Sequence, residues 1–435
     1  MPDPETGLRM RKRPLSLVLC SYSYGLGNGI AHMDKAMERL DPERFQLRRI
    51  VLRPDFAPGV SEEQDGVLYL ALAGAYPILC GLLREADLLH VNGPYDPVAV
   101  NAACAVGVPG VIEVMHQVET GGLHPGIDEV LCVSELVQSV QSHAHTRTIY
   151  NGIDVQRFSF SAERRHPDCV RVIQAANAAK ILHWELGEVA ALLDEEDVDY
   201  CMVGNRAAVY GLPSLGLVAD MPGVYHTADI LFVLEKRYAF GLVFAEAMAC
   251  GTLPIVSGDS GAAAYVEHGA SGWVVEPGTL EDAAAVLRQA IATARGPKAR
   301  AMRERARQTV QTRLSLGGML RQYEAVYERL GARARKSPKA PERWMDLGTA
   351  LLLFRAGNTA AFAFLDRFAA KSEPLDPTFL THPMGQSTLG VLLRDICPAL
   401  AARGYAALIR RVCAVLRHSH VTGPLLDRAE QDAGL

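Results

Sequence analysis

Short apolar runs alternate with amphipathic stretches along most of the chain. The first unit consists of an apolar run at 15–20, a glycine-rich turn at 24–29, and apolar residues at helical spacing over 30–40. The run predicts a buried strand and the spacing predicts a helix. Strand, glycine turn and helix in this order form the opening unit of a doubly wound sheet.

The same alternation continues to about residue 150. Strands are predicted at 45–52, 88–91, 111–114 and 129–133, with helices at 97–105 and at 135–142 after the capping residue Ser134. A turn signal at 151–154 precedes a polar stretch, 159–168, which is typical of a hinge.

A second array follows this hinge. Its predicted strands are 170–174, 200–203, 230–234, 254–256 and 273–275, and its predicted helices are 184–193, 244–249, 280–295 and 298–330. Two successive arrays predict an α/β fold of two facing Rossmann-like domains, 1–160 and 161–332, with a cleft between them.

The last part of the chain, 333–435, is rich in Ala, Leu and Arg, and begins with Pro338 and Pro341. We expect an appended helical region of about four helices, whose apolar clusters serve packing. Self-association, partner docking and acceptor access all remain open as roles for it.

One uncharged segment, 66–83, is about long enough to span a bilayer. Pro77 and several glycines interrupt it, and Asp65 and Glu85 flank it. A buried helix or a strand–helix edge is therefore favoured over a span, with a peripheral membrane surface left open.

Composition narrows the class of protein. The 435 residues are 49% hydrophobic with a formal net charge of -5, which argues against disorder and against nucleic acid as a partner. The nine cysteines include no C-x-x-C pair, and the acidic N-terminus lacks a signal-peptide pattern. Both features favour reduced thiols in a cytoplasmic protein.

The strongest local signal is the segment 240–256, FGLVFAEAMACGTLPIV. A glycine turn feeds a short helix that carries one carboxylate, Glu246. The backbone N–H groups at the helix N-terminus favour a phosphate, and the carboxylate can accept two hydrogen bonds from a ribose. Taken alone, such a glutamate is more often a solvated residue.

The sequence of this segment resembles the donor-site signature of family 4 of the retaining glycosyltransferases, which have the GT-B fold. The resemblance extends over 15–332 and includes the lead-in segments 215–221 and 225–230, the exit segments 258–261 and 267–275, and the hinge residues 151–154 with 157–158. It implies two facing Rossmann-like domains and a nucleotide-sugar donor site in the second one.

The resemblance also implies roles for individual residues. Glu246 holds the donor ribose, and Gly216, Leu217 and Val218 present backbone groups to the base. His116 faces the donor sugar, although by itself it is equally a histidine at a strand end. The remaining donor-site residues are Gly25, Gly27 and Gly29 of the first loop, Gly204 at the end of a strand, and Tyr238, Phe240, Gly241, Leu242 and Val243 of the signature.

Two departures from the family matter. Tyr238 stands where the family has a carboxylate that orients the donor, and Ala175 stands where it has an arginine beside the lysine, Lys180. One cation for the leaving diphosphate is therefore missing. Lys236 and Arg237 are candidates to replace it, the alternative being a solvated turn.

The sequence thus predicts an enzyme that moves a sugar from a nucleotide diphosphate-sugar, UDP-sugar by default, to an acceptor hydroxyl with retention of configuration. His116, Lys180 and Glu246 are its expected catalytic residues, with no separate cofactor and no metal. The acceptor is left open among a small molecule, a lipid and a glycan. The alternatives are a degenerate homologue that binds a nucleotide sugar or regulates a partner, and an enzyme for an unusual sugar or cyclitol.

Overall fold

The computed structural model describes residues 13–21, 29–53, 56–57, 59–93, 97–122, 124–161, 168–177, 180–193, 195–205, 211–339, 347–369, 393, 396–418 and 424–434. Gly25, Gly27 and most of the polar stretch 159–168 lie outside these ranges.

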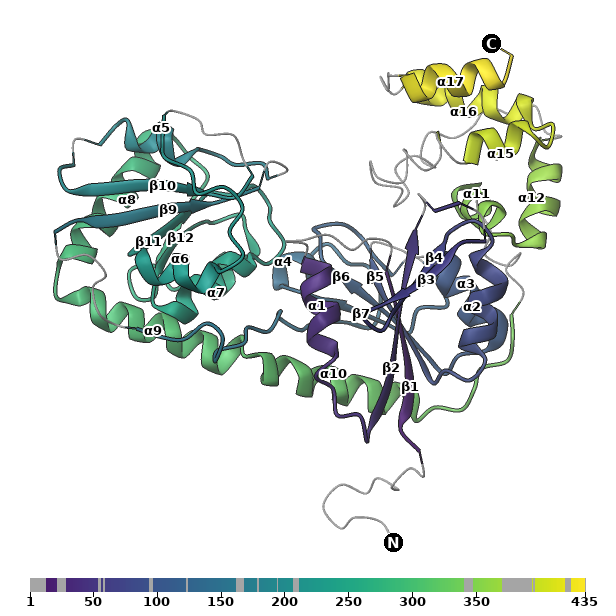
Figure 1. The fold of residues 1–435 in the computed structure, drawn as a ribbon, viewed down its shortest axis with the longest axis horizontal. Helices are drawn as coiled ribbons and strands as arrows, with labels where there is room; N and C mark the ends of the chain where they lie inside the picture. The colour runs from purple at the N-terminus through teal and green to yellow at the C-terminus, as the bar shows by residue number, and fades with distance from the viewer. Residues whose placement is uncertain are drawn as a thin grey trace, which may run out of the picture.

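Two sheets flanked by helices form the two halves of the molecule (Figure 1). The first has the order β3-β4-β2-β1-β5-β6-β7-β8 and is parallel except for β3, which pairs antiparallel with β4. Its strands are β1 (Leu15–Ser21), β2 (Phe45–Arg53), β3 (Ser61–Gln64), β4 (Val67–Ala71), β5 (Leu88–Gly93), β6 (Gly110–Met115), β7 (Glu129–Cys132) and β8 (Thr146–Thr148). The central strands β1, β5 and β6 are buried on both faces, as their continuous apolar sequence predicts.

The second sheet is parallel throughout and has the order β10-β9-β11-β12-β13. Its strands are β9 (Val170–Ala175), β10 (Val198–Val203), β11 (Ile230–Val233), β12 (Leu253–Ser257) and β13 (Trp273–Val275). Both predicted arrays are therefore confirmed, as is the prediction of two Rossmann-like units.

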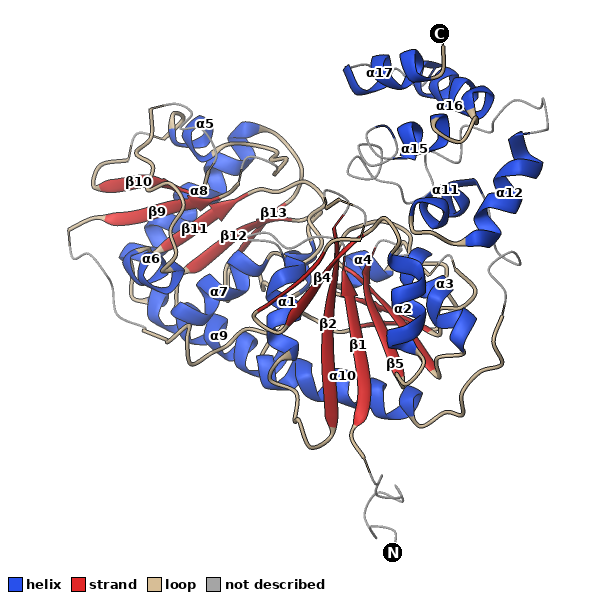
Figure 2. Ribbon diagram, turned by 45° about the vertical axis from the view of Figure 1, so that its right-hand side comes forward, coloured by secondary structure: helices blue, strands red, loops and turns tan. Residues whose placement is uncertain are grey.

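Helices cover both faces of the sheets (Figure 2). Those that follow the first-sheet strands are α1 (Gly29–Met37), α2 (Ala75–Leu83), α3 (Pro97–Val106) and α4 (Glu135–Gln138). The second half contains α5 (Leu186–Ala190), α6 (Met221–Thr227), α7 (Leu242–Cys250), the 3-10 helix η1 (Gly261–Ala264), α8 (Leu280–Arg295), α9 (Lys298–Arg313) and α10 (Leu316–Gly331).

The single helix predicted over 298–330 is wrong, because the chain leaves helical geometry between α9 and α10. The hinge segment 151–154 inserts there: Ile153 N–H donates to the Leu314 carbonyl at 2.8 Å, and Leu316 N–H donates to the Ile153 carbonyl at 3.0 Å. The break sends α10 back onto the first sheet, so that α9 and α10 together run beneath both halves (Figure 1). Arg44 of the first half forms ion pairs with Glu324 and Glu328 of α10.

The uncharged segment 66–83 forms β4 and the following helix α2, as the strand–helix interpretation expects. Among the helices that the structure describes, none is both long and apolar enough to cross a bilayer.

The predicted helical region is present after α10. Its described helices are α11 (Leu347–Arg355), α12 (Thr359–Ala369), α15 (Cys397–Ala401), α16 (Ala406–His418) and α17 (Pro424–Asp432). The region lies over the first domain, where α11 packs against α3.

Candidate active site

The helix of the strongest motif begins at a glycine that its geometry requires. Gly241 has φ +84°, and a Cβ there would lie 2.4 Å from the Phe244 ring. Helix α7 then runs from Leu242 to Cys250 and ends at Gly251, with φ +88°. Gly241 carries no side chain to cap α7, while the Phe244 N–H donates to the Gly241 carbonyl at 3.1 Å. The N–H groups of Leu242 and Val243 at the start of the helix are therefore those available to an anion.

A second helix N-terminus meets this one across the two halves. A Cβ on Gly29, the first residue of α1, would lie 3.9 Å from Cδ1 of Leu242, the first residue of α7. Two positive helix ends therefore converge from different sheets, an arrangement that favours a doubly charged group such as a diphosphate. Gly27 precedes this point but falls in the undescribed segment 22–28.

Glu246 lies one turn further along α7 and is half-buried. Its Oε2 accepts a hydrogen bond of 3.0 Å from the buried Tyr225 hydroxyl of α6. Burial raises the pKa of Glu246 to about 7, opposed by that hydrogen bond and by the charges of Arg157 and Lys180. Both cations are thus close enough to act on this carboxylate.

Lys180 forms an ion pair with Glu235, and both side chains are largely buried. The ammonium also lies 4.6 Å from the centre of the Tyr238 ring. The backbone explains the pairing, because the segment around Leu182 bridges antiparallel to Glu235 just beyond β11. Burial raises the pKa of Glu235, and Lys180 opposes the rise.

Glu235 is a site residue that the sequence analysis missed. The family resemblance places the second carboxylate at position 238, where Tyr238 stands with 39% of its surface exposed. The available signal was a lone acidic residue directly after the apolar strand β11, at the carboxyl edge of a parallel sheet where ligands bind.

Ala175, which the resemblance places at the position of the missing arginine, is buried at the end of β9. Of the proposed replacements, Lys236 and Arg237 are exposed, and Arg237 adopts φ +46°, which is uncommon for a residue with a side chain. Arg157 is also exposed, and its charge opposes the rise that burial causes in the pKa of Glu246. The pKa of His32 in α1 is lowered mainly by burial, and the charge of Arg157 adds to that lowering. Arg157 is therefore a third candidate cation.

The residues expected at the nucleotide base lie together beyond β10. Gly204, with φ +119°, donates its N–H to the Gly216 carbonyl at 2.7 Å. A Cβ on Gly204 would lie 2.1 Å from the Ala176 carbonyl oxygen, so only glycine fits. Leu217 is 78% exposed and Val218 is half-buried, which leaves an apolar rim beside these backbone groups.

His116 follows β6, is half-buried, and joins a polar network whose other members are buried. Its Nε2 lies 2.9 Å from Oδ1 of Asn92, whose amide nitrogen donates to Oδ1 of Asp34 in α1 at 2.6 Å. An ionised Asp34 only accepts hydrogen bonds, so Asn92 presents its oxygen to His116, which must donate from Nε2. Nδ1 is then the acceptor nitrogen of a neutral ring.

Burial keeps the His116 ring neutral. It lowers the pKa of His116 to about 3, with a smaller contribution from the charge of His90. His90 is itself fully buried, and its Nδ1 lies 2.7 Å from the Tyr327 hydroxyl of α10. The network thus joins the strand end carrying His116 to both α1 and α10.

Polar contacts fix the two halves around the site. Ser134 caps α4 and donates to the Ala239 carbonyl, just before the α7 motif. Arg313 of α9 donates to the Ala264 carbonyl at 3.2 Å and to the Tyr150 hydroxyl at 3.1 Å.

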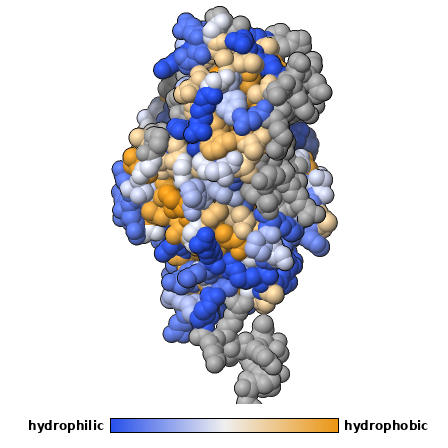
Figure 3. Space-filling model, turned by 90° about the vertical axis from the view of Figure 1, so that its right-hand side faces the viewer, coloured by the Kyte–Doolittle hydropathy of each residue, from blue (hydrophilic) through white to orange (hydrophobic). Residues whose placement is uncertain are grey.

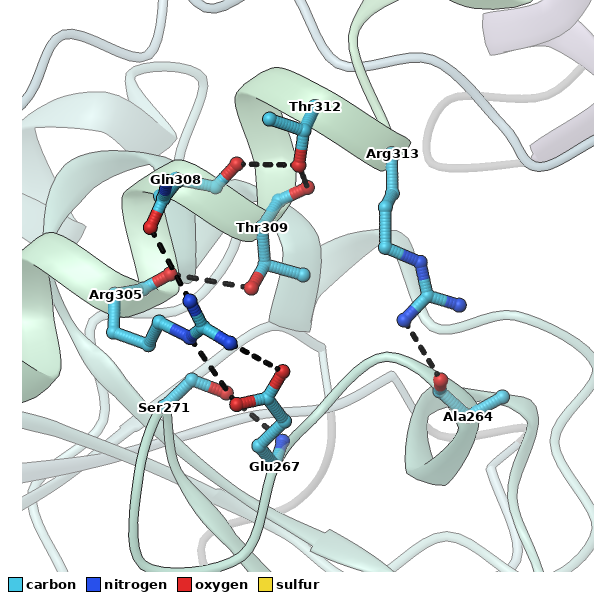
Figure 4. Close-up of polar contacts among 8 residues, drawn as sticks. All are labelled: Ala264, Glu267, Ser271, Arg305, Gln308, Thr309, Thr312 and Arg313. Atoms are coloured by element: carbon cyan, nitrogen blue, oxygen red, sulfur yellow. Dashed lines mark hydrogen bonds and ion pairs between the residues drawn. The ribbon is translucent and has the colours of Figure 1, made fainter.

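Figure 4 shows how α9 binds the exit segment of the motif: Arg313 donates to the Ala264 carbonyl, and Arg305 donates to both carboxylate oxygens of Glu267 at 3.1 and 3.2 Å. Glu267 thus fixes the exit segment to α9. Over the described ranges, no three His, Cys, Asp or Glu side chains gather as metal ligands.

The fold and this site define a protein with the GT-B architecture of glycosyltransferases. Residues 203–309 match the sequence model of the glycosyl transferases group 1 family. A segment of 114 residues is 35% identical to N-acetyl-alpha-D-glucosaminyl L-malate synthase of Bacillus anthracis, covering 26% of this chain and 29% of that relative. The chain therefore matches under a third of the length of this curated relative.

Solved structures share the whole two-domain fold. HepE of Anabaena, in complex with UDP and glucose, is 16% identical with a TM-score of 0.56, covering 72% of this chain and 100% of its own. A glycosyltransferase of Rickettsia africae is 15% identical with a TM-score of 0.61, covering 74% and 100%. The expected GT-B fold is thereby confirmed.

Proposed function

We propose that the protein transfers a sugar from a nucleotide diphosphate-sugar to an acceptor hydroxyl, with retention of configuration. The observation that carries this proposal is the convergence of the α1 and α7 N-termini beside Glu246 and Lys180. Each helix end contributes about 0.3–1 kcal/mol toward an anion, and more in a partly buried setting.

The residues divide the work as follows. Glu246 accepts hydrogen bonds from the ribose, and the first N–H groups of α7 and α1 hold the diphosphate. Lys180, held by Glu235 next to this point, stabilises the charge that develops as the diphosphate leaves. An oxygen of the leaving diphosphate takes the acceptor proton, while His116 positions the sugar through its acceptor nitrogen Nδ1.

UDP is the proposed nucleotide. The Anabaena neighbour is described with UDP, glucose and UDP-glucose, which supports a UDP-sugar donor for the same fold. The name of the Bacillus anthracis relative supports an N-acetylglucosaminyl donor and a small hydroxy acid as one acceptor class to test.

Calorimetry with UDP, GDP and ADP tests the donor site. We expect one of the three to bind the protein and Glu246→Ala to weaken it at least tenfold, because the ribose loses its acceptor. Lys298→Ala, on the exposed start of α9, is the matched control. Absence of binding by all three nucleotides, or equal affinity in Glu246→Ala, rejects the proposal.

A second candidate, binding without turnover, is favoured by one observation: the single lysine is already neutralised by Glu235 and the neighbouring position is Ala175. Incubation with a panel of UDP-sugars and acceptors separates the two functions. Release of UDP that depends on Lys180 supports transfer, whereas tight binding with no release across the panel supports the second candidate.

A further inference from the structure

A cavity of about 420 Å³ lies outside the cleft, between the first domain and the helical region. Val60 and Ile78 of the first domain line one side, and Phe354 and Phe362 of α11 and α12 line the other. Cavities of this size bind small organic ligands. Figure 3 views the side of the molecule where these parts meet, and apolar residues gather there among charged ones.

Backbone hydrogen bonds build the cavity wall. Gly74, the residue before helix α2, has φ +82° and provides no capping side chain. Gly74 N–H donates to the Arg355 carbonyl at 3.3 Å, and Tyr76 N–H donates to the Ala356 carbonyl at 3.0 Å. The carbonyl end of α11 thus caps the N-terminus of α2, which joins the helical region to the first domain at a fixed place.

The apolar lining remains partly open to water. Ile78 is 43% exposed and Val60 is 38% exposed, two of the few large apolar residues so exposed in the described structure. Exposed apolar side chains that face a hollow lose unfavourable contact with water when an apolar group enters.

Two guanidinium groups add charge to this apolar wall. Arg403 stacks on the Phe362 ring at 4.4 Å and on the Phe354 ring at 5.5 Å, and Arg355 lies beside it in the lining. Neither arginine forms an ion pair with a described carboxylate. An arginine stacked on aromatic faces keeps its N–H edges for an anion, which it can bind in a bidentate manner.

The cavity lies at the carboxyl edge of the first sheet, as does His116. Helix α2 starts after β4, which is two strands from β1 and four from β6. With neighbouring strands about 4.8 Å apart, the start of α2 lies about 10 Å from the end of β1 and about 19 Å from His116, measured along the edge of the sheet.

We propose that this cavity binds an apolar group bearing an acidic substituent, a carboxylate or phosphate, and extends the acceptor site of the enzyme. The acceptor role rests on the proposed glycosyl transfer, whereas the binding of an amphipathic anion does not.

Binding is tested with monomeric octyl phosphate, octanol and octylammonium, by calorimetry on the full chain. We expect octyl phosphate to bind, and Arg403→Gln to raise its Kd about tenfold, as for loss of one charge-assisted hydrogen bond. Arg300→Gln, an arginine 74% exposed on α9, is the matched control and leaves the Kd unchanged. The anion site is overturned if all three probes bind with the same Kd. It is also overturned if octyl phosphate binds Arg403→Gln and Arg300→Gln with the same Kd.

A second variant guards against misfolding of Arg403→Gln. Ile78→Glu adds a negative charge at an exposed position, so we expect octyl phosphate to be excluded and octylammonium to bind instead. In the transfer assay, Arg403→Gln should raise KM for the acceptor about tenfold and leave KM for the donor unchanged. An unchanged acceptor KM overturns the acceptor role, whereas failure of nucleotide binding overturns the proposed function and leaves the octyl phosphate result standing.

Discussion

The Tyr225 hydroxyl donates a 3.0 Å hydrogen bond to the Glu246 carboxylate, joining two helices at the point where a ribose is expected. The bond favours the ionised form of Glu246, while burial disfavours it and raises the pKa of Glu246 to about 7. Donor affinity should therefore depend on pH near neutrality, because the carboxylate accepts hydrogen bonds at both oxygens only when it is ionised.

We expect Tyr225→Phe to move that dependence to higher pH. Loss of a hydrogen bond to a charged group costs about 1.5–3 kcal/mol, or about one to two pKa units. The measurement is the Kd of a UDP-sugar from pH 5.5 to 9, since its diphosphate does not titrate in this range. Identical midpoints in the wild type and the variant would show that Glu246 does not control the affinity.

Glu246→Gln should stabilise the unliganded protein at high pH. The pKa of Glu246 is raised above its ordinary value of 4.5, so its favourable contribution to folding is complete below pH 4.5 and is lost as the pH rises through 7. Glutamine has no such loss, and we expect a gain of about 2 kcal/mol at pH 8 and little change at pH 4. Urea unfolding at both pH values measures it, and an equal effect at both would contradict this prediction.

The buried pair of Lys180 and Glu235 should behave differently from the two single residues. Lys180→Met leaves a buried carboxylate unpaired, and we expect it to destabilise the fold by about 3–5 kcal/mol. Glu235→Gln in the same chain should recover most of this loss while turnover stays absent, because the leaving diphosphate still lacks its cation. Recovery of turnover in the double variant would remove Lys180 from the mechanism.

A further pair of variants tests whether Lys236 and Arg237 replace the missing arginine. If Lys236 and Arg237 replace the missing arginine, the double change to Ala raises the Kd of the nucleotide severalfold, and more at low than at high salt. Arg237→Gly is the control for backbone geometry, since it removes the same charge while glycine adopts φ +46° without strain. Unchanged nucleotide affinity in the double variant leaves Arg157 as the candidate.

Most strands, and their grouping into two arrays, were predictable from the sequence. A strand that helices cover on both faces of a parallel sheet is a run of mostly apolar residues. Strands β3 (Ser61–Gln64) and β8 (Thr146–Thr148) were not predictable, since their residues are polar and at least partly exposed. The return of α10 to the first sheet was also not predictable. It depends on the backbone of Ile153 inserting between Leu314 and Leu316, residues far apart in sequence.

The same limit applies to the site. Glu246 and Lys180 stand in a motif, and the structure brings them into electrostatic contact. Tyr225 and Glu235 were missed because their roles arise from packing between elements: α6 against α7, and the segment around Leu182 against Glu235. Hydrophobic periodicity indicates which face of a helix or strand is buried. It does not indicate which side chains of other elements contact that face.

Asn92 is expected to act on the reaction through His116. It accepts from His116 Nε2 and donates to Asp34, so it fixes the orientation of the His116 ring. Asn92→Leu should lower kcat about tenfold or more and change nucleotide Kd less than twofold, with some loss of stability because Asp34 loses one of its hydrogen bonds. His116→Ala should lower kcat further, and adding Asn92→Leu to it should have no additional effect on kcat. Additive losses in the double variant would mean that Asn92 acts by another route, such as the position of α1.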